Sequence, residues 1–98
     1  MNAEPAISLA SVVVRNDGLL MTEVDGEVIL LSTAQGLYFG LDLIGTEIWK
    51  QLARPMNVAG LCAALAERYE EPEPGAIERD VLDLLAELHE KQLVMVPR

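Results

Sequence analysis

The chain has 98 residues, a formal net charge of −9 and 51% hydrophobic side chains, enough apolar material for one ordered core. This acidity excludes binding to nucleic-acid phosphates through clustered basic residues. A single cysteine cannot form an internal disulfide, which favours a reducing compartment, and no apolar run reaches transmembrane length. We therefore expect a single cytoplasmic domain over residues 1–98, with no nucleic-acid or membrane partner.

The first third of the chain is β-prone. Residues 1–10 are weakly patterned and predict a loose arm, whereas residues 11–15 are β-branched and predict a short strand or an extended lead-in. Residues 19–24 and 27–32 flank Asp25-Gly26, and Asp-Gly between two such runs is typical of a two-residue type I′ hairpin. We expect an antiparallel pair of strands here.

The two-residue turn also determines which side chains face each other. It places Leu20 opposite Leu31 on one face and Met21 opposite Leu30 on the other. A sheet that is wet on one side should alternate more cleanly between apolar and polar residues. We therefore expect the second face to be covered, by the chain itself or by a partner.

A third strand runs directly into a helix. Residues 37–41 predict the strand, and strand alternation places Tyr38 and Phe39 on opposite faces. Asp42 is suited to cap the helix that follows, because its carboxylate can accept from early backbone N–H groups. The helix is predicted from about residue 43 to residue 53, with Pro55 beyond its end.

Two more helices complete the pattern. Asn57 is the predicted cap of a helix over residues 58–69, an acidic proline-bearing break follows, and the third helix is predicted over residues 75–92 before a short apolar tail at 93–96. The order is α+β. It predicts a winged helix-turn-helix-like fold, with an N-terminal three-stranded antiparallel meander followed by three helices.

Side chains suited to catalysis or metal binding are few. His89 is the only histidine and has no Cys or His partner at ligand spacing. Cys62 lies in the apolar stripe of the second helix, where packing is the expected role. The carboxylates Glu70, Glu71 and Glu73 indicate a solvated loop. We expect no enzyme, no catalytic residue, no metal and no cofactor.

A binding module remains. The acidic third helix would repel DNA phosphates, but the last strand of a meander has an open edge to which an extended peptide can add. Two alternatives stay open at this point. One is a winged-helix regulatory protein acting through protein contacts, and the other is a homodimer formed through the apolar second face.

An ordered set of motifs carries a family resemblance. The motifs are Asp25-Gly26-Glu27, the strand at 28–31, the segment Gly36 to Asp42, Gly45 with Ile48-Trp49, and a final helix from Asp80 to Leu88 followed by Leu93-Val94. Together they resemble the PqqD family, named for the chaperone of pyrroloquinoline quinone biosynthesis. The resemblance extends over residues 11–96.

The resemblance implies a RiPP recognition element, a non-enzymatic domain that captures the leader of a ribosomally made precursor peptide. Such a domain presents the peptide to a modifying enzyme, such as a radical S-adenosylmethionine protein or a lasso leader protease. The leader is expected to add as a strand beside the third strand and third helix. The implied peptide-binding residues are Leu37, Tyr38, Phe39, Gly40, Leu41, Arg79, Asp80, Asp83, Leu84 and Glu87. Their acidic flank suits a leader with Lys or Arg.

Overall fold

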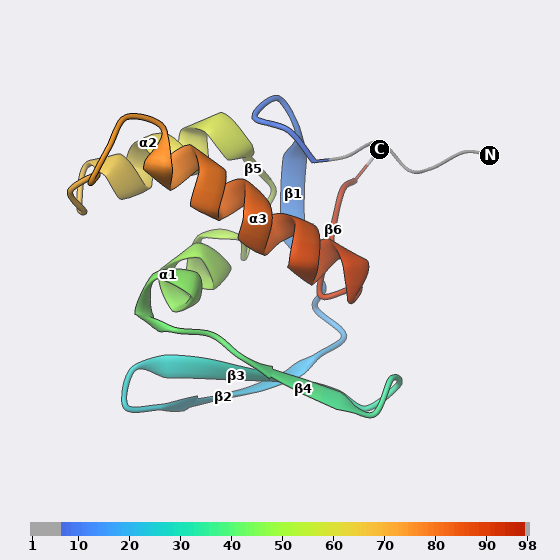
Figure 1. The fold of residues 1–98 in the computed structure, drawn as a ribbon. Coiled ribbons are helices and arrows are strands. Elements are labelled where there is room, and N and C mark those ends of the chain that lie inside the picture. Colours follow the sequence, from blue (N-terminus) through green and yellow to red (C-terminus); the bar gives the residue numbers. More distant parts are fainter. Residues whose placement is uncertain (1–6, 98) are drawn as a thin grey trace.

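The computed structural model describes residues 7–97, which contain a three-stranded antiparallel sheet, three helices and a second small sheet (Figure 1). In chain order the elements are β1 (Val12–Arg15), β2 (Leu20–Val24), β3 (Glu27–Ser32), β4 (Leu37–Gly40), α1 (Leu43–Gln51), β5 (Met56–Asn57), α2 (Val58–Ala66), α3 (Ala76–Glu90) and β6 (Val94–Met95). The predicted α+β class is confirmed. The fold resembles a winged helix only loosely, because β1 pairs with β5 and β6 in a second, separate sheet.

The β2–β3 hairpin has the predicted turn and register. Asp25 and Gly26 have φ values of 52° and 84°, as both central residues of a type I′ turn require. Leu20 pairs with Leu31 and Met21 with Leu30. Strand β4 then joins the free side of β3 in antiparallel fashion, so that the sheet order is β2-β3-β4.

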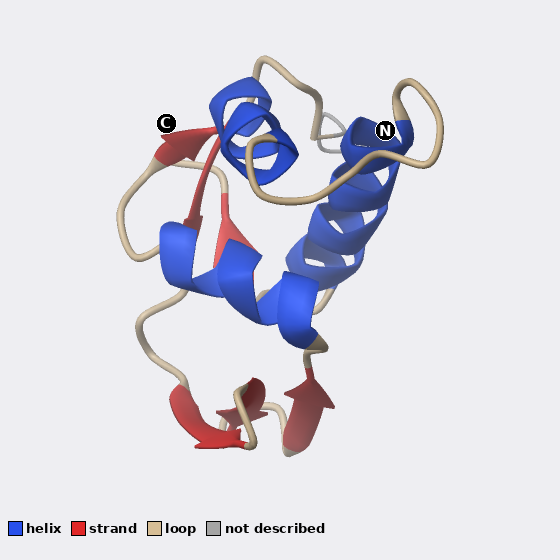
Figure 2. Cartoon of the chain, turned by 90° about the vertical axis from the view of Figure 1, so that its left-hand side faces the viewer, coloured by secondary structure: helices blue, strands red, loops and turns tan. Residues whose placement is uncertain are grey.

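One face of this sheet stays open to solvent. The helices all lie on the other side of it (Figure 2). On the open face, which we call the outer face, Leu20, Val24 and Tyr38 are 61%, 53% and 75% exposed. The expectation that the chain itself covers this face is therefore wrong for residues 7–97, while cover by a partner stays a prediction.

The first two helices begin at the predicted caps. The Gly45 N–H donates to Asp42 Oδ1 at 2.7 Å, and the Gly60 N–H donates to Asn57 Oδ1 at 3.2 Å. Each helix ends two or three residues before the predicted end. Turn residues fill the difference, as is usual where helix ends tighten.

The third helix begins in a different way. Gly75 precedes it in a left-handed conformation with φ of 83° and has no side chain to act as a cap. Instead, the Ile77 N–H donates to Glu71 Oε2 at 3.0 Å, and Glu73 Oε2 accepts from Arg79 at 3.1 Å. The loop predicted to be merely solvated therefore supplies the cap of α3.

The N-terminal arm was predicted to be loose over residues 1–10, and its described part is not. The Leu9 carbonyl accepts from the Ala59 N–H at 3.0 Å, and Ile7 and Leu9 pack partly buried against the core. Residues 7–10 thus lie alongside the start of α2 in space. Residues 1–6 lie outside the described part of the chain.

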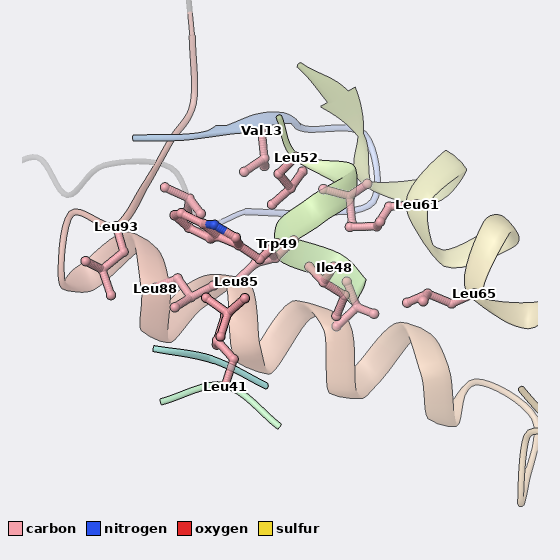
Figure 3. Close-up of a cluster of buried hydrophobic side chains, with 14 of the residues drawn as sticks. Val13, Leu41, Ile48, Trp49, Leu52, Leu61, Leu65, Leu85, Leu88 and Leu93 are labelled. Carbon is pink, nitrogen blue, oxygen red and sulfur yellow. The ribbon is translucent and has the colours of Figure 1, made fainter. Parts of the chain in front are cut away.

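The core lies among the three helices, and both sheets contribute side chains to it (Figure 3). Trp49 is buried in it, and its Nε1–H donates to Met21 Sδ at 3.3 Å. The guanidinium of Arg15 lies 5.6 Å from the centroid of the Trp49 ring, a cation–π distance. The tryptophan therefore joins α1 to both sheets.

Candidate functional site

Strand β4 has one paired edge and one free edge. The Leu41 N–H donates to the Val28 carbonyl at 2.8 Å. Because inward and outward backbone groups alternate along an antiparallel strand, the N–H and C=O of Phe39 also point toward β3. Those of Tyr38 and Gly40 point away from the sheet. The free edge of β4 thus offers two N–H donors and two carbonyl acceptors to an added strand.

Helix α1 closes the end of the sheet beside this edge. The Val28 N–H donates to Thr46 Oγ1 at 2.9 Å, and this hydrogen bond is buried. No loop separates the strand from the helix. Leu41 makes the last backbone hydrogen bond to β3, and Asp42, the next residue, already caps α1. The strand and the helix are therefore held in fixed relation through Thr46 and Asp42.

A hollow of about 440 Å³ lies between β4, the start of α1 and α3. Its apolar walls are Phe39, Leu41, Ile44, Ile48, Val81 and Leu84. Two carboxylates, Asp42 and Asp80, also line it. An apolar groove beside a free strand edge is the arrangement that accepts an extended peptide, because the edge pairs with the backbone while the groove takes side chains.

The structure places most of the predicted site residues at this hollow or on the elements that line it. Phe39, Gly40, Leu41, Asp80 and Leu84 contribute to its lining. Leu37 and Tyr38 lie on the same strand, β4, and Asp83 and Glu87 lie exposed on α3. Arg79 is bound to the carboxylate of Glu73 in the preceding loop and does not line the hollow. Its role in a peptide site stays a prediction.

Five residues that line the hollow were not among the predicted peptide-binding residues: Asp42, Ile44, Gly45, Ile48 and Val81. Ile44 is 46% exposed, whereas Ile48 and Leu52, which follow it at four-residue spacing, are buried. It lines the hollow. The only available signal was its position in the first turn of α1, directly after the edge strand, where the helix has just begun to cover the sheet.

The far end of α3 is fixed beside the beginning of β4. The ammonium of Lys91 lies 5.8 Å from the centroid of the Phe39 ring and 3.9 Å from Glu87 Oε2. The Gln35 side chain donates to the Lys91 carbonyl at 2.8 Å. Helix α3 therefore borders β4 from the hollow at Leu41 to the turn that precedes Leu37.

The thiol of Cys62 lies in the core and is not part of the hollow's lining. Burial raises the pKa of the Cys62 thiol above its ordinary value of 9.0, and the nearby charges of Glu78 and Glu71 raise it further, which makes the thiol a poor nucleophile. Residues 7–97 contain no group of three or more His, Cys, Asp and Glu side chains suited to a metal ion. In the same range, no helix is long and apolar enough to span a membrane.

The fold and the groove define a class of protein, a small α+β domain with an open strand edge beside a helix. The chain belongs to the PqqD family, because the family model described as coenzyme PQQ synthesis protein D matches residues 27–94. The match runs from β3 into β6 and includes the whole hollow. The resemblance inferred from the sequence motifs is confirmed.

A solved structure supports the same assignment. The chain is similar to TbiB1, whose structure was determined in complex with the TbiA(beta) leader peptide, with 30% sequence identity and a TM-score of 0.76. The alignment covers 87% of this chain and 98% of TbiB1. A comparison with curated protein sequences gives no significant match.

Proposed function

We propose that this protein binds the leader segment of a ribosomally synthesised precursor peptide and presents that peptide to a modifying enzyme. The observation that carries the proposal is the free edge of β4, where Tyr38 and Gly40 direct their backbone groups outward beside the apolar hollow. Membership of the PqqD family and the similarity to a leader-bound structure support the same function.

The leader would bind as a fourth strand of the β2-β3-β4 sheet. Its backbone would pair with Tyr38 and Gly40, and every second side chain would point toward α3. Those side chains would meet the walls of the hollow, including Ile44 and Leu84. In this arrangement backbone pairing supplies affinity for any extended segment, and the hollow supplies selectivity.

The protein would act as a chaperone and not as a catalyst, and the chemistry would belong to its partner. A radical S-adenosylmethionine protein and a lasso leader protease are the two partner classes that fit a PqqD-type domain. The setting would be the cytoplasm, where a lone buried thiol such as Cys62 stays reduced.

The outer face of the sheet supports a contact with a second protein. Its exposed residues Leu20, Val24 and Tyr38 form an apolar surface, and Tyr38 belongs both to this face and to the free edge of β4. A modifying enzyme placed here would lie next to the bound leader. Dimerisation through the same face is the competing possibility, which sedimentation of the free protein would detect as a doubled mass.

Proline substitution at the free edge tests strand addition. Tyr38→Pro removes one outward N–H and adds a ring on the side where the peptide approaches, yet edge strands tolerate proline at such positions. We expect binding of the leader segment to weaken at least about tenfold, because one backbone hydrogen bond and close approach are both lost. Fluorescence anisotropy of the labelled leader gives the affinity.

Two companion variants separate the backbone from the side chain. Tyr38→Ala removes the ring but keeps the N–H, so it should retain most of the affinity. Phe39→Pro removes an N–H that points toward β3 and should disrupt the sheet itself. Unchanged leader affinity in a folded Tyr38→Pro protein, judged by the fluorescence of buried Trp49, would show that the leader does not add to this edge.

A further inference from the structure

The surface between β4 and α3, which includes the hollow, differs in charge between its two ends. Near Leu41, both Asp42 and Asp80 line the hollow. The guanidinium of Arg79 contacts Asp80, with Nε 3.7 Å from Oδ1, and it also contacts Glu73, with Nη1 3.1 Å from Oε2. Asp80 and Glu73 therefore share one guanidinium. Together with Asp42, this end carries three negative charges and one positive charge, a net charge of −2.

The opposite end, at the beginning of β4, is neutral. There Glu87 lies 3.9 Å from the ammonium of Lys91, and the same ammonium lies over the ring of Phe39. One positive and one negative charge balance each other. A peptide that spans the groove thus meets an apolar, neutral end and an apolar, negatively charged end.

The register of β4 relates these ends to positions on a bound strand. A strand that pairs with Tyr38 and Gly40 directs the side chains opposite Phe39 and Leu41 toward α3, because alternate residues share a face. Two such side chains are about 7 Å apart along the strand. The one opposite Phe39 meets the apolar walls, and the next one along meets the end that holds Asp42 and Asp80.

The direction of the added strand follows from the sheet that it extends. Both existing pairings, β2 with β3 and β3 with β4, are antiparallel, and antiparallel pairing is slightly more stable per residue than parallel pairing. In an antiparallel strand, the residue opposite Leu41 precedes the residue opposite Phe39 by two positions in the peptide sequence.

We propose that the groove selects a leader segment in which Lys or Arg stands two positions before a large apolar residue. The apolar side chain packs on the part of the hollow formed by Phe39 and Leu84, and the basic side chain faces Asp42 and Asp80 in the same hollow. This inference rests on the proposed leader-binding function and adds to it a charge pattern and a direction.

Three fluorescein-labelled 12-residue peptides test this pattern. All contain Ser and Thr around one Leu; the first has Lys two positions before the Leu, the second has Lys two positions after it, and the third has Glu in place of the preceding Lys. At low salt, the first should bind at least about fivefold more tightly than the other two, as expected for a partly exposed charge contact. At 0.5 M NaCl the difference should shrink, because salt screens the contact.

Charge-neutral variants assign the preference to the two carboxylates. Asp42→Asn keeps the α1 cap, since Asn and Asp are equally good N-caps, and it is combined with Asp80→Asn. The double variant should bind all three peptides within about twofold of one another. Glu67→Gln combined with Glu70→Gln removes two charges from exposed positions outside the hollow. This double variant is the matched control and should keep the full preference.

The possible outcomes distinguish failure of the charge pattern from failure of the proposed leader-binding function. Equal binding of the three peptides, tighter binding of the second, or a preference that survives in the double variant would each overturn the charge pattern. Leader-induced NMR shifts at the Tyr38 and Gly40 amides would leave strand addition standing in those cases. If neither the leader nor any designed peptide shifts these amides at millimolar concentration, the function and the inference both fail.

Discussion

At the scale of single residues, Thr46 connects the sheet to the helix that follows it. Its hydroxyl accepts from the Val28 N–H at the position where β4 can no longer pair. Both partners are buried, so the amide has no access to water if the hydroxyl is lost. An unsatisfied buried N–H costs more than an average hydrogen bond contributes.

We expect Thr46→Val to lower the free energy of unfolding by about 1–3 kcal/mol, the desolvation cost of one buried amide. Valine keeps the shape and β-branching of threonine, so packing and helix propensity change little. Urea unfolding followed by the fluorescence of the single tryptophan, Trp49, measures the change.

The conservative variant for this site is Thr46→Ser, which keeps the hydroxyl and loses one methyl group. It should cost no more than about 1 kcal/mol. A Thr46→Val protein as stable as the parent, or a Thr46→Ser protein destabilised equally, would show that the hydrogen bond to Val28 does not matter for stability.

At the scale of elements, α3 depends on the loop before it. The helix begins after a glycine and has no side-chain cap of its own. Glu71 supplies one from the loop, accepting from the Ile77 N–H, and its negative charge also suits the positive end of the helix dipole. The first turns of α3 carry Asp80 and Val81, so this loop positions one wall of the hollow.

Glu71→Ala should therefore destabilise the start of α3 by about 1 kcal/mol, the usual cost of a lost cap. Amide hydrogen exchange at Ile77 should become several-fold faster while exchange in β3 stays unchanged. The neighbouring variant Glu70→Ala removes the same charge from an exposed position and should leave Ile77 protected. If hydrogen exchange at Ile77 accelerates equally in both variants, the effect comes from the change in net charge and not from the lost cap.

At the scale of the whole molecule, the C-terminal segment completes the core. Leu93 and Val94 are fully buried, although they follow the last helix and lie far in sequence from β1. The Asn16 N–H donates to the Leu93 carbonyl at 3.0 Å, and β6 pairs with β1. The two ends of the described chain are thus joined through one core (Figure 1).

Leu93→Ala should cost about 2–5 kcal/mol, as for other buried leucines that leave a cavity. In a chain of this size, the loss should appear as one lower unfolding midpoint seen equally by Trp49 fluorescence and by helix signal. Met95→Ala, two residues on at an exposed site, should change stability by less than about 0.5 kcal/mol. Two separate transitions in Leu93→Ala would mean that the two sheets unfold independently.

Several parts of the structure could be predicted from the sequence alone, because they depend on interactions between residues close together in the chain. The Asp25-Gly26 turn, the hairpin register and the caps at Asp42 and Asn57 each depend on neighbours a few residues away. The ordered motifs also identified the family. Strand alternation correctly separated Tyr38, which is exposed, from Phe39, which packs against the core.

Only the tertiary structure decided which apolar residues are core and which line a groove. Ile44 and Ile48 are equivalent in a helical pattern and both line the hollow, yet one is half exposed and the other buried. The placement of all three helices on one side of the β2-β3-β4 sheet likewise left the outer face uncovered by residues 7–97 (Figure 2). Periodicity reports that a side chain is apolar; the distance to elements remote in sequence determines whether it is covered by the chain or left open to bind a peptide.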